Sequence, residues 1–266
     1  MDTIRIIHNL QRSGGTIISK SVSAQKNIIL LSEIHPEGPK IMEKMGAEPK
    51  YADPLYQFQS FYKLFDFNEL KNLKETKLNF LEKIKTINKK VNDQNKILII
   101  RDWSFVDYFG KPFIEPTKKN ILLDILSKDF EIKNIFIIRD PLENYISCCR
   151  KLVFFLKNYS FDQFLESYKA YIKSIPRDNH IKFEEFTENP EKTLEKISSK
   201  LNFDFDKEYL KNMKNVKITG DKQANSSDNI IKVKKIGNEI LNEDQKEKIN
   251  KNEKYIEIKN ILDKFI

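Results

Sequence analysis

The chain has 266 residues, of which 39% are hydrophobic and 11% aromatic. It can therefore bury a substantial core, and its length favours a single domain over residues 1–266. The formal net charge is +8, but lysines are spread along the whole chain, so we do not expect nucleic acid as the main partner; a small polyanion would suit the charge. No run of about 18 apolar residues occurs, so we expect no membrane span.

The cysteines and histidines of the chain argue against disulfide bonds and against a metal site. The two cysteines, Cys148 and Cys149, are adjacent and cannot join distant segments, which indicates a reducing compartment and a cytoplasmic location. The three histidines, His8, His35 and His180, are far apart and lack the spacing of metal ligands. We therefore expect no metal site.

Short apolar runs alternate with longer segments of helical periodicity. This alternation is typical of a parallel sheet covered by helices, and it predicts a three-layer α/β fold with a central, mostly parallel sheet. The expected strands are residues 4–10, 27–31, 96–102, 134–140 and 180–186.

Three helices stand out between the strands. Leucine and isoleucine recur at steps of three and four over residues 69–91, which predicts one surface helix. A second helix should begin at Asp140 and Pro141, as a cap and first residue, and Pro190 should open a third within residues 187–201. The polar segment 218–237 is the longest expected loop.

The segment HNLQRSGGTIISKSV, residues 8–22, follows the first expected strand. A strand, a turn with two glycines and a helix from Thr16 would direct several backbone N–H groups at one point, which favours an anion. Arg12 adds a fixed charge, and Ser13 and Thr16 add hydroxyl groups. The pattern GxxxxGK followed by Ser or Thr is absent. Taken alone, the segment could also be a simple strand-to-helix turn.

QRSGGT with its following helix resembles the P-(R/K)-S-G-T-T loop of sulfotransferases that use 3′-phosphoadenosine 5′-phosphosulfate (PAPS). In that family the loop holds the 5′-phosphosulfate. In IIRDPLENYISCCRK, Ser147 follows Arg139 by eight residues, which is similar to the family's 3′-phosphate site. The segment 182–205 is similar to a third family element, a strand, an acidic turn and a helix. The resemblance covers about residues 4–240 and implies the sulfotransferase form of the P-loop nucleotide-hydrolase fold.

The sequence departs from the family pattern at three points. Gln11 stands where proline is common, Gly15 replaces a threonine, and no Arg-Lys-Gly element is present. Lysines of the late loop could replace that element. The resemblance thus implies that PAPS, and its product 3′,5′-adenosine bisphosphate (PAP), bind to Arg12, Ser13, Gly14, Gly15, Thr16, Ile17, Arg139, Ser147, Lys232, Lys234 and Lys235.

Sulfuryl transfer needs a general base for the acceptor and positive groups for the leaving oxygens. We expect Arg12 to stabilise the developing charge. Glu33 lies twenty-one residues after Arg12, a position similar to the glutamate base of tyrosylprotein sulfotransferases, and His35 is the alternative base. Glu33 could instead only cap a turn.

Arg101 and Asp102 end the third expected strand and should face the same crevice. They could orient the acceptor or brace Glu33, and a simple strand-end ion pair is the other reading. Trp103, which follows them, could form part of an acceptor wall or belong to the core. The acceptor itself, a small molecule, carbohydrate or peptide with a hydroxyl or amine group, has no signature in the sequence. Two other functions remain open at this point: an atypical P-loop kinase that uses ATP, and a non-catalytic module that binds nucleotides or polyanions.

Overall fold

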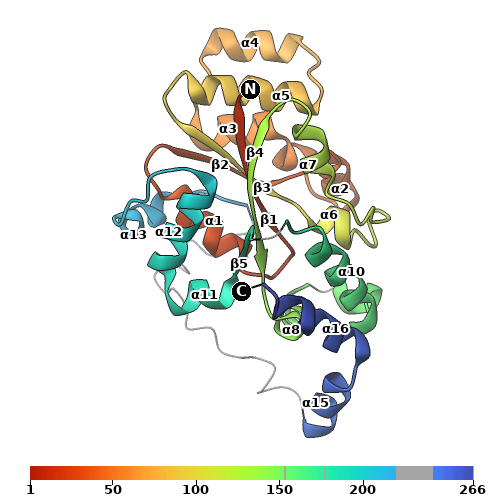
Figure 1. Cartoon of the computed structure of the whole chain (residues 1–266). Helices are drawn as coiled ribbons and strands as arrows, with labels where there is room; N and C mark the ends of the chain where they lie inside the picture. Colours follow the sequence, from red (N-terminus) through yellow and green to blue (C-terminus); the bar gives the residue numbers. More distant parts are fainter. Residues whose placement is uncertain (153, 177, 220–241, 266) are drawn as a thin grey trace.

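The structure is a computed structural model that describes residues 1–152, 154–176, 178–219 and 242–265. Within these ranges one five-stranded sheet has the order β2-β3-β1-β4-β5, and every neighbouring pair is parallel. Helices flank the sheet (Figure 1), so the predicted α/β class is confirmed. The strands are β1 (Thr3–Asn9), β2 (Ile28–Ile34), β3 (Ile97–Asp102), β4 (Glu131–Ile138) and β5 (His180–Lys182).

The strands are almost continuously apolar because helices cover both of their faces. Neighbouring residues point to opposite faces of a strand. Ile6 therefore packs into one apolar cluster and Ile7 into another, and both are fully buried. β-branched isoleucine suits this crowded, pleated surface.

One face of the sheet carries helices of the first and last thirds of the chain. Ile18 and Val22 of the first helix pack there with Leu194 and Ile197. These helices lie on the left of the sheet in Figure 1. They are α1 (Gly15–Ser23), α11 (Phe183–Glu188), α12 (Pro190–Leu201), α13 (Tyr209–Asn212) and the 3-10 helix η2 (Met213–Asn215).

The opposite face has two apolar clusters. The cluster near the strand amino ends contains α3 (Pro54–Tyr62), α5 (Phe80–Asn92) and α7 (Ile121–Leu126). The cluster near the carboxyl ends contains α6 (Phe105–Tyr108), α8 (Pro141–Lys151), α9 (Phe155–Asn158), α10 (Phe161–Lys173) and α16 (Glu253–Leu262).

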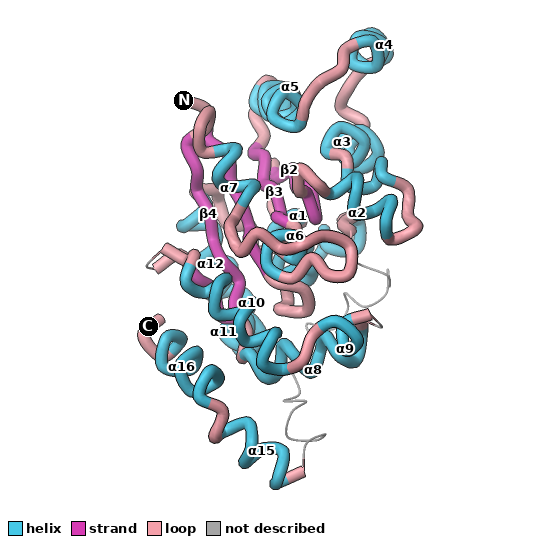
Figure 2. Tube along the Cα trace, turned by 90° about the vertical axis from the view of Figure 1, so that its right-hand side faces the viewer, coloured by secondary structure: helices cyan, strands magenta, loops and turns pink. Residues whose placement is uncertain are grey.

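The remaining helices lie at the periphery. Figure 2 places α4 and α15 at opposite ends of the molecule, as does Figure 1. No helix in the described ranges is long and apolar enough to cross a membrane. The peripheral elements are α2 (Gly38–Lys44), η1 (Pro49–Ala52), α4 (Phe67–Glu75) and α15 (Glu243–Asn250).

Two predicted helix starts are confirmed. The Asp140 carboxylate accepts hydrogen bonds from the N–H groups of Leu142 (3.0 Å) and Glu143 (3.1 Å), with Pro141 as the first residue of α8. The Asn189 side chain caps α12 in the same way, with Pro190 as its first residue. Both caps satisfy N–H groups that have no acceptor inside the helix.

Two predicted boundaries are wrong. Residues 69–91 belong to two helices, because Thr76 is extended and Asn79 starts α5 with a reciprocal capping box to Glu82. The strand expected over 180–186 ends at Lys182, where α11 begins. Acidic residues are disfavoured in strands but stabilise the first turn of a helix, which suits the two glutamates after Phe183.

The strand order favours a ligand position between β1 and β4. The chain leaves β1 towards β2 on one side, whereas it leaves β4 towards β5 on the other. In an open parallel sheet, ligands bind beside the carboxyl ends of two such neighbouring strands. The loops after Asn9 and Ile138 therefore flank the expected position of a ligand.

We predict that His180 makes the stability of the protein pH-dependent. Its ring is 4% exposed and stacks on Phe265 at 4.8 Å. Burial, assisted by lysines, lowers the pKa of His180 below its ordinary value of 6.5. The charged groups that face it are Lys196, Lys182, Glu185 and Lys200.

Below pH 6.5 the unfolded chain therefore binds a proton that the folded chain does not. The free energy of unfolding should fall as the pH falls from that value towards the folded-state pKa of His180. The variant His180→Gln should show a flatter pH dependence in urea unfolding at a series of pH values. Equal slopes for the variant and the wild type would contradict the prediction.

Candidate functional site

The loop between β1 and α1 is a tight turn that depends on both of its glycines. The Ser13 hydroxyl and N–H both donate to the Leu10 carbonyl, at 2.7 and 3.3 Å. A Cβ atom on Gly14 would lie 2.0 Å from the Phe183 ring, and Gly14 has a φ of 92°. A Cβ atom on Gly15 would lie 2.2 Å from Cγ of Asn9. Neither position accommodates a larger residue without rearrangement.

The amino end of α1 has the electrostatics of an anion site. Gly14 caps the helix without a side-chain hydrogen bond, and the first turn contains no acidic residue. The N–H groups of this turn, which includes Thr16 and Ile17, have no acceptor inside the helix, and the helix dipole adds partial positive charge. The exposed Arg12, with a φ of 61°, precedes it. An anion fits here without displacing a protein carboxylate from this turn.

Helix α8 and Arg139, two residues before it, are hydrogen-bonded directly to this loop. Arg12 Nε donates to Ser147 Oγ at 3.3 Å, and Arg139 Nη1 donates to the Arg12 carbonyl at 2.9 Å. Asn144 Nδ2 donates to the Gln11 carbonyl at 2.8 Å. The structure thus brings the predicted 5′ residues and the predicted 3′ pair, Arg139 and Ser147, to one place.

Arg139 is a buried cation at this junction. Its guanidinium is 5.2 Å from the centre of the Phe183 ring, and Nη2 is 3.8 Å from Glu143 Oε2. Burial lowers the pKa of Arg139, an effect that Glu143 and Glu184 oppose. Among the described residues, its Nε atom has no hydrogen-bond partner. The site therefore has unused donor capacity.

Glu33 lies where β2 is irregular. The pairing of β2 with β3 shifts between Ser32 and Ile34, and Glu33 adopts a φ of 59°. This left-handed conformation costs about 1–3 kcal/mol for a residue other than glycine. A bulge of this kind redirects a side chain. The Glu33 side chain is 23% exposed, and its Oε1 is 3.2 Å from Arg101 Nη2.

Arg101 connects Glu33 to the end of β1, directly before the loop that leads to α1. Its Nε donates to Asn9 Oδ1 at 3.0 Å, and Asn9 is the residue against which Gly15 packs. Nη1 donates to Ser32 Oγ (3.2 Å) and to the Thr219 carbonyl (3.4 Å). Burial lowers the pKa of Arg101, and Glu33 opposes this shift. A guanidinium stays charged in proteins, so these partners compensate its burial.

His35 is buried, and both of its ring nitrogens have partners. Nδ1 accepts a hydrogen bond from the Glu37 N–H at 3.1 Å, so Nε2 carries the proton and donates to Asp107 Oδ1 at 3.2 Å. The ring is 1% exposed. Burial also raises the pKa of Asp107, which His35 opposes. Through these contacts His35 holds the end of β2 against α6.

Asp102 and Trp103 follow Arg101 but have different surroundings. The Asp102 carboxylate is 2.9 Å from His8 Nδ1 and accepts from the Ser104 hydroxyl at 2.6 Å, below the protein surface. The His8 ring is buried. Trp103 keeps part of its surface exposed. Its backbone N–H donates to the Ile34 carbonyl at 3.1 Å.

Several site residues could not be named from the sequence. Asn9, Asn144 and Phe183 contact the loop, yet only Asn144 has a local signal, since it lies three residues before Ser147, on the same face of the helix. The predicted lysines Lys232, Lys234 and Lys235 lie outside the described residues.

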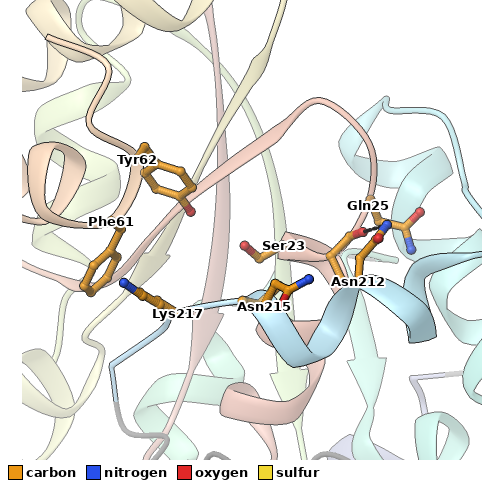
Figure 3. Close-up of a pocket in the computed structure, with 9 residues that line it drawn as sticks. Ser23, Gln25, Phe61, Tyr62, Asn212, Asn215 and Lys217 are labelled. Carbon is orange, nitrogen blue, oxygen red and sulfur yellow. Dashed lines mark hydrogen bonds between the residues drawn. The ribbon is translucent and has the colours of Figure 1, made fainter. Parts of the chain in front are cut away.

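A surface pocket of about 330 Å³ lies at the other end of α1 (Figure 3). Ser23 is eight residues after Gly15, which is roughly 12 Å along a helix. Within this pocket the Tyr62 hydroxyl bonds to the N–H (2.9 Å) and the carbonyl (2.8 Å) of Leu30. No predicted donor-binding or catalytic residue lines the pocket, so we do not assign the chemistry to it.

Comparison with known proteins supports the fold. No family model matches the chain, and no curated sequence matches it. The sulfotransferase domain of the curacin biosynthetic pathway is similar with a TM-score of 0.61 and 14% identity, over 99% of this chain and 98% of that one. The sulfotransferase domain of the Synechococcus PCC 7002 olefin synthase is similar with a TM-score of 0.55 and 16% identity, over 79% and 76%. The chain therefore has the sulfotransferase fold.

Proposed function

We propose that this protein transfers a sulfuryl group from PAPS to a hydroxyl or amine group of an acceptor. The observation that carries the proposal is the junction of the phosphate loop and α8. Arg12 touches Ser147 and Arg139 touches the Arg12 carbonyl, so two anion-binding groups lie next to each other. A donor with charged groups at both its 5′ and 3′ positions matches such a pair.

Different residues of the junction would bind the two ends of the donor. The N–H groups at 14–16 and the Arg12 guanidinium would hold the 5′ end, and Arg139 with Ser147 would hold the 3′-phosphate. The bound donor supplies a sulfuryl group on a phosphate leaving group. Arg12 and the helix amino end would stabilise the negative charge that the leaving oxygen gains, as preorganised donors do in other transfer enzymes.

Glu33 would act as the general base. Its carboxylate takes the proton from the acceptor hydroxyl while the new oxygen–sulfur bond forms and the bond from sulfur to the 5′-phosphate oxygen breaks. Arg101 would orient the Glu33 carboxylate. Through its hydrogen bond to Asn9, which packs against Gly15, it would also fix the position of Glu33 relative to the loop. Glu33 fits this role better than His35, because both His35 nitrogens are engaged.

Replacing Ser147 with alanine should weaken PAP binding about tenfold, the effect of losing one hydrogen bond to a charged group. The thermal shift produced by PAP measures this, because a ligand that binds only the folded state raises the Tm. Ser199→Ala is the matched control, since Ser199 is an exposed serine of α12. ATP and 5′-AMP should stabilise the protein less than PAP. Equal stabilisation by ATP would instead indicate a kinase.

Replacing Glu33 with glutamine should lower kcat about 10²- to 10⁴-fold, because the variant keeps the shape of the side chain but accepts no proton. PAP binding should be unchanged. Transfer is measured from PAPS to a panel of phenols, aliphatic alcohols, sugars and tyrosine peptides. Glu75→Gln, at an exposed position of α4, is the control. Full activity of Glu33→Gln would refute the assignment of the base.

A further inference from the structure

Four aromatic rings form a continuous row beside the candidate site. Neighbouring ring centres are 6.4 Å (Trp103 to Phe105), 5.9 Å (Phe105 to Phe154) and 5.4 Å (Phe154 to Phe113) apart. The rings come from the turn after β3 (Trp103), the first residue of α6 (Phe105), the loop before α7 (Phe113) and the turn after α8 (Phe154). Phe105 is buried, whereas the other three keep part of their surface exposed. We call these four residues the aromatic row.

One end of the aromatic row lies at the proposed base. The backbone N–H of Trp103 donates to the carbonyl of Ile34, the residue after Glu33. Trp103 also follows Arg101 by two residues, and Arg101 holds the Glu33 carboxylate. Phe105 packs in the same apolar cluster as Leu10, which leads into the phosphate loop. The row is therefore attached through the Trp103 backbone next to Glu33, and it shares an apolar cluster with the residue before the loop.

The polar side chains of this region turn inward. Asp102 Oδ2 accepts from the Ser104 hydroxyl and lies 2.9 Å from His8 Nδ1, whereas Oδ1 is buried without a hydrogen-bond partner among the described residues. Asp107 accepts from His35, from the hydroxyl of Thr117 and from the N–H of Ile121. Both carboxylates are 1% exposed, so they lie out of reach of the many hydroxyl groups of a sugar. A site built for such a ligand presents unpaired polar groups to it.

We propose that the acceptor carries its hydroxyl on a flat apolar body that lies on the aromatic row. This inference rests on the proposed function and narrows its acceptor class. Rings of the acceptor would pack on Trp103, Phe154 and Phe113, and the hydroxyl would point to Glu33. Aromatic rings favour flat apolar partners in offset or edge-to-face packing, and exposed apolar patches of a soluble protein commonly mark binding sites. The hydroxyl proton passes to Glu33, and its oxygen takes the sulfuryl group.

The only tryptophan of the chain gives a direct readout, because Trp103 belongs to the row. In the presence of saturating PAP, 4-nitrophenol should quench the Trp103 fluorescence with a saturable curve, whereas N-acetylglucosamine should not. Phe154→Ala should weaken this binding about tenfold, the discrimination expected from one apolar contact. Phe67→Ala is the control, since Phe67 is 81% exposed on the remote helix α4. Free N-acetyltryptophanamide corrects for unspecific quenching.

Turnover with PAPS gives the second readout. A naphthol should be a better acceptor than N-acetylglucosamine or a tyrosine peptide, and Phe154→Ala should raise the naphthol KM about tenfold with kcat and PAP affinity unchanged. The conservative variant Phe154→Leu covers the case in which the alanine variant fails to fold. A sugar or peptide acceptor that outperforms naphthol, or unchanged quenching in both Phe154 variants, would overturn the inference and leave sulfuryl transfer intact. Loss of PAP binding together with absence of all transfer would instead overturn the proposed function.

Discussion

The candidate site depends on the attachment of α8 to the loop after β1. Four hydrogen bonds hold α8 and the preceding Arg139 to this loop: from Arg12 to Ser147, from Arg139 to the Arg12 carbonyl, and from Asn144 and the Cys148 thiol to the Gln11 carbonyl. They bring together two groups of candidate anion-binding residues that lie on separate elements. Because a buried guanidinium without partners is costly, Arg139 also enforces the geometry of the loop. The same arginine thus shapes the loop and supplies positive charge at the position where the strand order predicts a ligand.

A second set of hydrogen bonds, made by Arg101, connects the end of β1 to Glu33. Arg101 contacts Asn9, Ser32 and Glu33, and so joins the ends of three neighbouring strands. The strained backbone at Glu33 persists because the Arg101 pair and the bulge of β2 over-determine it. Strain of this kind is concentrated at functional sites. The arrangement holds the Glu33 carboxylate beside Arg101 and partly open to solvent, which is what the proposed role of a general base requires.

The sequence predicted the five strands because short runs rich in isoleucine favour buried strands. It also predicted the turn between β1 and α1 and the caps of α8 and α12. It failed between Thr76 and Asn79, where apolar periodicity continued through a helix break that the Asn79 to Glu82 capping signal already marked. Contacts such as Phe183 with Gly14 could not be predicted. They join residues far apart in the chain, and nothing in the local pattern of either residue encodes the approach.

The most direct test of the central claim is a crystal structure of the protein with PAP bound. The account predicts the 5′-phosphate against the N–H groups of residues 14–16, with the 3′-phosphate beside Arg139 and Ser147 in the same molecule of ligand. A nucleotide bound in the pocket between Ser23 and Lys217, or one that leaves Ser147 without contact, would contradict it.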